Sequence, residues 1–199
     1  MEARIIEIST KLFSTYGIKS ITMDEISREL GMSKKTIYQY FEDKKALVNA
    51  VIEHALATEA TKIADIESRN LNPIEEVFNH MKQIKEMLGN MNVTFLYDLQ
   101  KYFPVAFAKY EAFKVENVTS VENNLKRGIK LGLYRADINV HILARFRIET
   151  VDMSFDPRIF NKDEFTLLEI QLETMDHFIR GILSPKGLET YEYTKKQFK

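Results

Sequence analysis

Residues 21–47 constrain the fold more than any other part of the chain, because they carry the start and stop signals of two short helices. Thr22 followed three residues later by Glu25 is typical of a capping box, in which each side chain satisfies a free backbone N–H of the other residue. Gly31 suits the left-handed conformation that ends a helix, and Ser33 suits the start of the next one. Two helices joined by a glycine-containing turn, the second polar and basic, predict a DNA-binding helix-turn-helix.

The second helix of this motif divides its residues between the interior and the solvent. Ile37 and Phe41 are expected to face inward. Six residues are expected to face outward: Lys34, Lys35, Thr36, Tyr38, Gln39 and Tyr40. Asp43 suits the cap of a third helix that begins at Lys44. Lysines at the two helix starts add to the positive ends of the helices, which predicts focused contacts with phosphate.

The composition places this motif in a globular chain with little net charge. The 199 residues include 28 Lys and Arg and 29 Asp and Glu, so the net charge is −1 and indiscriminate coating of nucleic acid is disfavoured. A second copy of the motif is therefore expected for useful affinity. The absence of cysteine excludes disulfides and thiolate metal sites. With no signal-peptide pattern and no apolar run of ~20 residues, we expect a cytoplasmic protein that does not enter the membrane.

Helical periodicity continues through the rest of the chain, and no strand pattern is present. An opening helix is predicted over residues 3–16, and one unbroken helix is predicted from Lys44 to Asn70. We therefore expect an all-α fold of about nine helices. A three-helix helix-turn-helix domain would occupy residues 1–47, and a larger helical domain for effector binding and dimerisation would occupy residues 48–199.

Apolar residues near the C-terminus recur at alternating spacings of three and four. They are Phe165, Leu168, Leu172, Met175, Ile179 and Ile182. Such a seam suits helix pairing, and together with the apolar helix over residues 138–155 it predicts a homodimer that forms a four-helix bundle. The alternative is a thick core within one chain. Asp137 is expected to cap the helix over 138–155, and Asn161 with Glu164 is expected to cap the seam helix. The residues beyond Gly187 are expected to form a loosely held polar tail.

Large side chains in two regions offer material for a ligand pocket. They are Phe95, Tyr97, Tyr102, Phe107, Tyr110, Phe146 and Met153. Because ligand pockets are mostly apolar with a few placed polar groups, these residues favour an apolar or amphipathic effector over a sugar or a metal. The alternative is that they only pack in a core. Four charged residues also lie in the apolar helix over 138–155: Arg145, Arg147, Glu149 and Asp152. Arg145 and Glu149 are spaced to pair with each other, and the alternative is an arginine that binds a carboxylate.

The chain lacks the residue patterns of common catalytic sites. Its four histidines are scattered, and none has a glutamate three residues before it, as a helical di-metal site would require. No cysteine nucleophile, phosphate-binding glycine loop or Gly-x-Ser-x-Gly turn is present. We therefore predict a protein that is not an enzyme and that uses no metal or cofactor.

The first fifty residues resemble the DNA-binding domain of TetR-family transcriptional regulators. The matching positions are Leu12, Phe13 and Gly17 in the first helix and its end, Thr22, Met23, Asp24, Glu25 and Ile26 at the start of the second helix, Gly31, Met32 and Ser33 at the turn, and Thr36, Ile37, Tyr38, Gln39, Tyr40, Phe41, Lys44 and Leu47 beyond it. Ser27 departs from the alanine usual in the family but is small enough to fit. The resemblance covers roughly a quarter of the chain. It implies a homodimer that binds a palindromic operator in double-stranded DNA, as a repressor released by a small molecule.

The resemblance also implies roles for individual residues. Lys34, Lys35 and Gln39 would face base edges, in keeping with the hydrogen-bonding chemistry of lysine with guanine and glutamine with adenine. Six residues would contact phosphates: Thr22, Ser33, Thr36, Tyr38, Tyr40 and Lys44. The identity of the effector is not implied. The alternative function is that of a DNA-bound architectural or adaptor protein of the same fold without a small-molecule effector.

Overall fold

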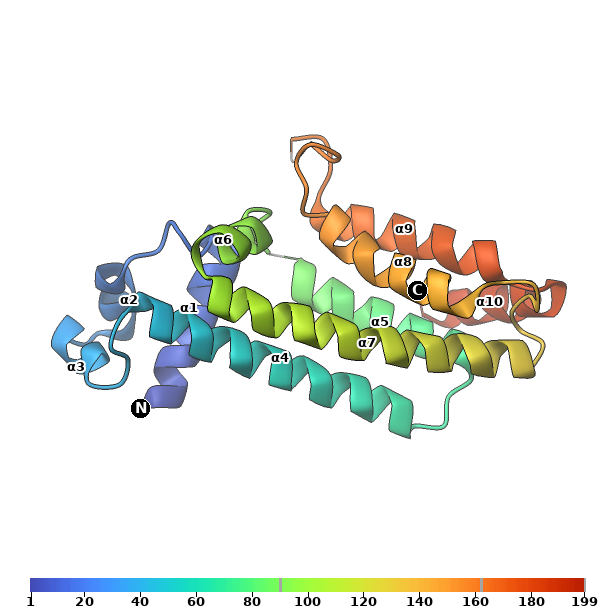
Figure 1. The fold of residues 1–199 in the computed structure, drawn as a ribbon, viewed down its shortest axis with the longest axis horizontal. Coiled ribbons are helices and arrows are strands. Elements are labelled where there is room, and N and C mark those ends of the chain that lie inside the picture. The colour runs from blue at the N-terminus through green and yellow to red at the C-terminus, as the bar shows by residue number, and fades with distance from the viewer. Residues whose placement is uncertain (90, 162, 199) are drawn as a thin grey trace. The chain divides into compact units, whose positions relative to one another are not determined.

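The computed structural model describes residues 1–89, 91–161 and 163–198, and these residues form ten α-helices (Figure 1). The helices are α1 (Glu2–Tyr16), α2 (Met23–Leu30), α3 (Lys34–Tyr38), α4 (Lys44–Ser68), α5 (Pro73–Leu88), α6 (Phe95–Tyr102), α7 (Pro104–Lys130), α8 (Val140–Met153), α9 (Leu167–Ile182) and α10 (Pro185–Gln197). The all-α prediction is confirmed, with one helix more than the nine expected. Within the described ranges the β-structure consists of an isolated bridge between Tyr134 and Leu183.

The helices divide into two compact units. The first contains Met1–Ala60 and Asn90–Phe113, and the second contains Thr61–Gly89 and Lys114–Lys199. Helices α4 and α7 each contribute residues to both units. The first unit extends beyond the predicted domain of residues 1–47, because α6 and the start of α7 pack on the same core. The assignment of DNA binding to residues 1–47 and of effector binding to residues 48–199 stays a prediction.

The core of the first unit lies among α1, α2 and α3, with contributions from α4, α6 and α7. Phe13, Ile26 and Ile37 are completely buried in it, and Leu99 of α6 is almost completely buried. Burying an apolar side chain of this size stabilises a fold by about 1.5–3 kcal/mol. The helix-turn-helix is therefore held by a core that residues far along the chain complete.

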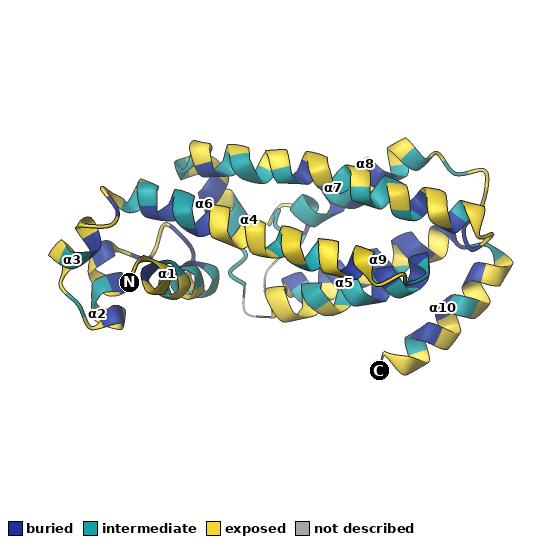
Figure 2. Cartoon of the chain, turned by 90° about the horizontal axis from the view of Figure 1, so that it is seen from below, coloured by how far each residue is buried: buried dark blue, intermediate teal, exposed yellow. Residues whose placement is uncertain are grey.

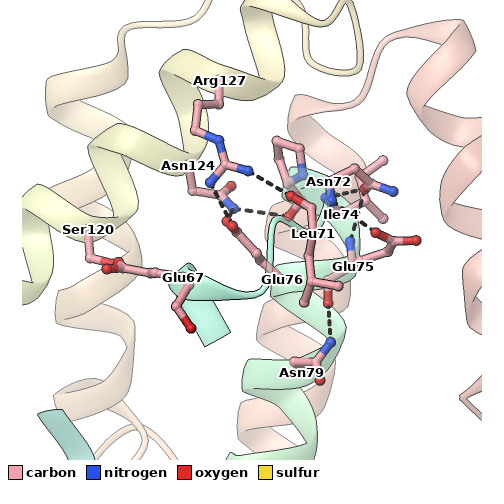
Figure 3. Close-up of polar contacts among 12 residues, drawn as sticks. Glu67, Leu71, Asn72, Ile74, Glu75, Glu76, Asn79, Ser120, Asn124 and Arg127 are labelled. Carbon is pink, nitrogen blue, oxygen red and sulfur yellow. Dashed lines mark hydrogen bonds and ion pairs between the residues drawn. The ribbon is translucent and has the colours of Figure 1, made fainter. Parts of the chain in front are cut away.

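In the second unit, a buried carboxylate joins the start of α5 to α7. Glu76 is 2% exposed, and it accepts hydrogen bonds from Arg127 at 2.6 Å and from Asn124 at 2.7 Å. Figure 3 shows both side chains reaching from α7 toward Glu76. Asn72 caps α5 in the same region by accepting from the N–H of Ile74 at 3.0 Å. Because a buried charge is costly unless it is paired, this network fixes the register between α5 and α7.

Helix α10 contains residues 188–197 of the predicted tail, so the expectation of a loosely held tail is wrong for them, and residue 199 lies outside the described residues. Ser184 caps the helix by accepting from the N–H of Gly187 at 3.0 Å. Tyr191 is completely buried, its ring lies 5.1 Å from that of Phe78, and its hydroxyl donates to Asp176 of α9. The polar composition of this segment gave no indication that Tyr191 packs the helix against α5 and α9.

Two helices begin later than their predicted caps. Asn139, not Asp137, caps α8 by accepting from the N–H of Ile142 at 3.1 Å. Thr166, not Asn161, opens α9 and forms a capping box with Glu169. Each of these loops contains several cap-forming residues, and the one used is the one directly before the residues that pack in the core.

Candidate DNA-binding site

The start of α2 is fixed by the predicted capping box. The Thr22 hydroxyl accepts from the N–H of Glu25 at 3.2 Å, and the Glu25 carboxylate accepts from the N–H of Thr22 at 2.7 Å. These hydrogen bonds from Thr22 hold the pKa of Glu25 below its ordinary value. The carboxylate therefore stays ionised next to the positive end of α2, which stabilises the helix.

The turn between α2 and α3 also follows the predicted pattern. Gly31 has a φ of 65° and a ψ of 32°, a left-handed conformation that other residues adopt at a cost. Ser33 then caps α3, since its hydroxyl accepts from the N–H of Thr36 at 3.1 Å. Asp43 caps α4 by accepting from the N–H of Ala46 at 2.7 Å. Helix α3 is thus fixed at its start, and α4 follows it after a short turn.

Exposed and buried residues alternate along the segment that contains α2 and α3 (Figure 2), and most of the predicted DNA-contacting residues are exposed. The exposed ones are Thr22, Ser33, Lys34, Lys35, Tyr38, Gln39 and Tyr40. Thr36 is half-buried and shares a 2.8 Å hydrogen bond with the Ser33 hydroxyl. Ile37 and Phe41 face the core as predicted. The exposed set combines two cations with phenol, hydroxyl and amide groups, the chemistry that contacts phosphates and base edges.

Lys34 forms an ion pair with Asp24 of α2. The two charged groups lie 3.0 Å apart, and the hydrogen bond to Asp24 raises the pKa of Lys34. Both side chains are largely exposed, so solvent and salt weaken this ion pair. Lys34 can therefore exchange Asp24 for an acceptor on DNA at little cost.

Lys44 has a structural role that the sequence did not reveal. Its ammonium group donates to the carbonyl oxygens of Ile18 at 2.6 Å and Ile21 at 2.5 Å, with a longer contact to Lys19 at 3.4 Å. Burial lowers the pKa of Lys44. The side chain thus ties the start of α4 to the loop between α1 and α2, and its contact with phosphate stays a prediction.

Helix α6 also binds the loop between α1 and α2. Asp98 is 5% exposed and accepts from the N–H of Lys19 at 2.9 Å. The loop begins at Gly17, whose φ is 86° and where a Cβ atom would lie 2.9 Å from the Thr94 hydroxyl. Asn92 donates its N–H to the carbonyl of Ser14 at 2.6 Å. Residues 92–98 therefore hold the end of α1, a contact between remote segments that periodicity could not indicate.

The predicted effector residues fall in both units. In the first unit Phe95, Phe107 and Tyr110 pack against the core, Tyr97 is half exposed, and Tyr102 lies beneath the Lys19 ammonium. In the second unit Phe146 is half exposed and Met153 is half-buried. Two described clefts, of about 390 and 470 Å³, are lined by other residues of the second unit. The pocket assignment stays a prediction, and neither cleft supports it.

The seam of α9 is divided between the core and the surface. Met175, Ile179 and Ile182 are at most 7% exposed and belong to the interior of their own unit, so they offer little surface to a second chain. Phe165 is 46% exposed, and Leu168 and Leu172 are half-buried. The predicted dimer interface therefore narrows to the N-terminal half of the seam.

Known proteins match this chain in sequence and in fold. A family model described as bacterial regulatory proteins of the tetR family matches residues 5–51, the segment that forms the capped helix-turn-helix. Residues 5–51 carry a TetR-family DNA-binding domain. An uncharacterised HTH-type transcriptional regulator of Bacillus subtilis, YvaF, is 29% identical over 186 residues, which cover 92% of this chain and 95% of that protein.

Solved structures of transcriptional regulators share the fold of this chain. FadR from Bacillus subtilis, in complex with stearoyl-CoA, has a TM-score of 0.69 at 15% identity and covers 92% of this chain and 100% of its own. A regulator from Saccharomonospora viridis, in complex with choline, has a TM-score of 0.74 at 16% identity and covers 92% and 97%. At these identities the similarity shows the fold. None of the described helices has the length and apolar character that crossing a bilayer requires.

Proposed function

We propose that this TetR-family regulator binds a palindromic operator as a homodimer and acts as a repressor that a small organic effector releases. The observation that carries the proposal is the exposed face of α3, where Lys35, Tyr38 and Gln39 stand on a helix capped at its start and packed through Ile37. A short helix with such a face fits the major groove, where side chains distinguish base pairs.

The net charge supports a paired site. With a net charge of −1 the chain offers little general attraction to DNA, so affinity must come from a few local contacts. Two copies double those contacts and favour a palindrome with half-sites about 34–36 Å apart. Exposed apolar side chains on α8 and directly before α9, namely Ile142, Phe146 and Phe165, would supply surface for the pairing.

A small effector is supported by related folds. The FadR structure contains stearoyl-CoA and the Saccharomonospora viridis structure contains choline, so this helical fold accommodates organic ligands in those two proteins. In our proposal the effector binds the second unit and favours a conformation in which the two α3 helices no longer match the operator. Linkage then requires DNA and effector to weaken each other by the same factor.

Selection of bound DNA from a random pool tests the proposal, with enrichment of a palindrome as the expected result. Failure to enrich any two-fold symmetric sequence would overturn it. Small molecules are then screened for release of the selected DNA. A bound palindrome that no molecule releases would favour the adaptor without an effector.

Replacement of Gln39 by alanine is expected to weaken binding to the selected operator by about 1–3 kcal/mol and to relax the preference at one base position. The reason is the loss of an exposed amide that can form two hydrogen bonds with adenine. Titration of the operator and of its single-base variants measures both effects. Gln197→Ala, an exposed glutamine in α10, is the matched control and should change neither. Unchanged base preferences in Gln39→Ala would contradict the assignment.

Replacement of Leu172 by arginine is expected to convert the dimer into monomers, because a charge would enter the apolar contact between chains. Sedimentation equilibrium measures the change, and circular dichroism checks that the helices are retained. Leu188→Arg places the same charge on the exposed face of α10 and should leave the dimer intact. A dimer that withstands Leu172→Arg would place the interface elsewhere.

A further inference from the structure

Arg147 of α8 is a cation buried inside the second unit. Arg147 is only 6% exposed. It donates from Nε to the sulfur of Met175 at 3.2 Å and from Nη1 to the hydroxyl of Thr150 at 2.9 Å. Among residues 1–89, 91–161 and 163–198, no carboxylate forms an ion pair with it. Burial lowers the pKa of Arg147 to about 10, so the group keeps its charge at neutral pH.

Lys114 of α7 is a second buried cation, and it contacts α8. Lys114 is 8% exposed, and its ammonium group lies 3.1 Å from the carboxylate of Glu149 and 2.5 Å from that of Asp152. Both carboxylates belong to α8, so Glu149 pairs with Lys114, where pairing with Arg145 was predicted. Two carboxylates thus neutralise Lys114, whereas the hydrogen-bond partners of Arg147 are an uncharged thioether and an uncharged hydroxyl.

A second buried polar side chain in this unit is only partly satisfied. Gln171 of α9 is 1% exposed, and its amide nitrogen donates to the hydroxyl of Ser154 at 2.8 Å. Its amide oxygen has no hydrogen-bond partner among the residues that the structure describes. Gln171 lies one helical turn before Met175, the residue that accepts from Arg147, so the unpaired acceptor and the buried cation lie on the same side of α9.

His80 of α5 is partly buried, and it does not change the net charge around Arg147. Burial lowers its pKa below the ordinary value, and the charge of Arg147 contributes to that lowering, so His80 is neutral at neutral pH. The core of this unit includes Ala144 of α8 and Phe178 and Ile179 of α9, which are apolar. A charged guanidinium in such surroundings is costly, and a methionine of similar length would be cheaper to bury. Packing alone does not explain an arginine at this position.

We propose that Arg147 anchors an organic anion, a carboxylate carried on an apolar body, in the interior of the second unit between α8 and α9. The carboxylate would accept from the guanidinium N–H groups that have no partner within the described part of the chain, as arginine and carboxylate pair in two-point geometry. The apolar body would replace contacts among the core side chains beside Met175. This proposal rests on the proposed function, since it names the chemical class of the effector.

Binding at this site requires the helices to move. Arg147 is nearly inaccessible, and neither of the two described clefts is lined by it. An anion would therefore enter as α8 and α9 separate, and pairing of the buried charge would offset the lost packing. A ligand that binds only the separated arrangement shifts the population toward it, which is the property that an effector needs.

Thermal unfolding of the DNA-free protein tests the site with decanoate and 1-naphthoate, each compared with its neutral primary amide. Either carboxylate, in large excess, is expected to raise the Tm of the wild type by about 5 °C or more, and the amides are not. Arg147→Met should abolish the difference between carboxylate and amide while its own Tm stays equal to or above that of the wild type. Arg145→Met, which removes an exposed arginine two residues away on α8, should keep the wild-type response.

The outcomes separate this inference from the proposed function. If neither carboxylate exceeds its amide, or if Arg147→Met lowers the Tm and leaves the ligand response intact, the anchor is overturned and Arg147 is structural. If the carboxylate response depends on Arg147 but the anion does not release the selected operator, the site stands and release by an effector fails. Operator affinity of Arg147→Met without ligand should match the wild type.

Discussion

Replacement of Gly187 by alanine is expected to lower the free energy of unfolding by about 3 kcal/mol. A Cβ atom at this position would lie 1.9 Å from the carbonyl oxygen of Leu133 and 3.1 Å from the Leu183 side chain. The Leu133 carbonyl cannot yield easily, because it accepts from the N–H of Ser184 at 2.9 Å. The start of α10 must therefore shift, and this shift withdraws Tyr191 from the core. Urea-induced unfolding measures the loss.

Gly181→Ala is the control for this prediction. Gly181 lies near the end of α9, is exposed, and would place a Cβ atom in open space. Because alanine favours the helix more than glycine does, the control should be stabilised by about 0.5 kcal/mol. Equal stability of Gly187→Ala and the wild type would show that α10 is not docked tightly at its start.

Replacement of Lys44 by methionine is expected to lower the free energy of unfolding by about 2 kcal/mol and to weaken binding to every DNA sequence alike. Methionine keeps the apolar stem but leaves the carbonyls of Ile18 and Ile21 without their donor, and each unsatisfied acceptor is costly. The loop before α2 would then loosen, and the helix-turn-helix would be less well positioned. Urea-induced unfolding and titration of operator and unrelated DNA measure the two effects.

Lys45→Met is the matched control, since Lys45 is the exposed neighbour in the same helix turn. It removes the same charge and should leave the free energy of unfolding within about 0.5 kcal/mol of the wild type. If both variants unfolded at the same urea concentration, the carbonyl contacts of Lys44 would have no structural weight.

The features predicted correctly are those that depend on neighbouring residues. The capping box of Thr22 and Glu25, the left-handed Gly31 and the cap at Ser33 each arise within a few residues, so the sequence shows them directly. The inward positions of Ile37 and Phe41 follow from helical spacing in the same way. These local signals sufficed to predict the helix-turn-helix.

Contacts between remote segments could not be predicted from the sequence. Nothing near Glu76 indicates that Arg127 of α7 will reach it, and nothing in the polar tail identifies Tyr191 as a core residue. Arg145 and Arg147 illustrate the same limit, because an apolar helix with two arginines does not reveal which of them its neighbours will cover. Only the packing of α9 on α8 distinguishes the exposed arginine from the buried one.

The arrangement at Lys44 sets a limit on how this regulator can engage DNA. An ammonium group has three protons to donate, and the Lys44 nitrogen has contacts with three carbonyl oxygens of one loop. A phosphate oxygen could accept a hydrogen bond from Lys44 only by displacing one of those carbonyl oxygens, most readily the distant one of Lys19. Contact with the DNA backbone would therefore compete with the hydrogen bonds that close the loop before α2. The protein would bind the operator with this loop slightly loosened.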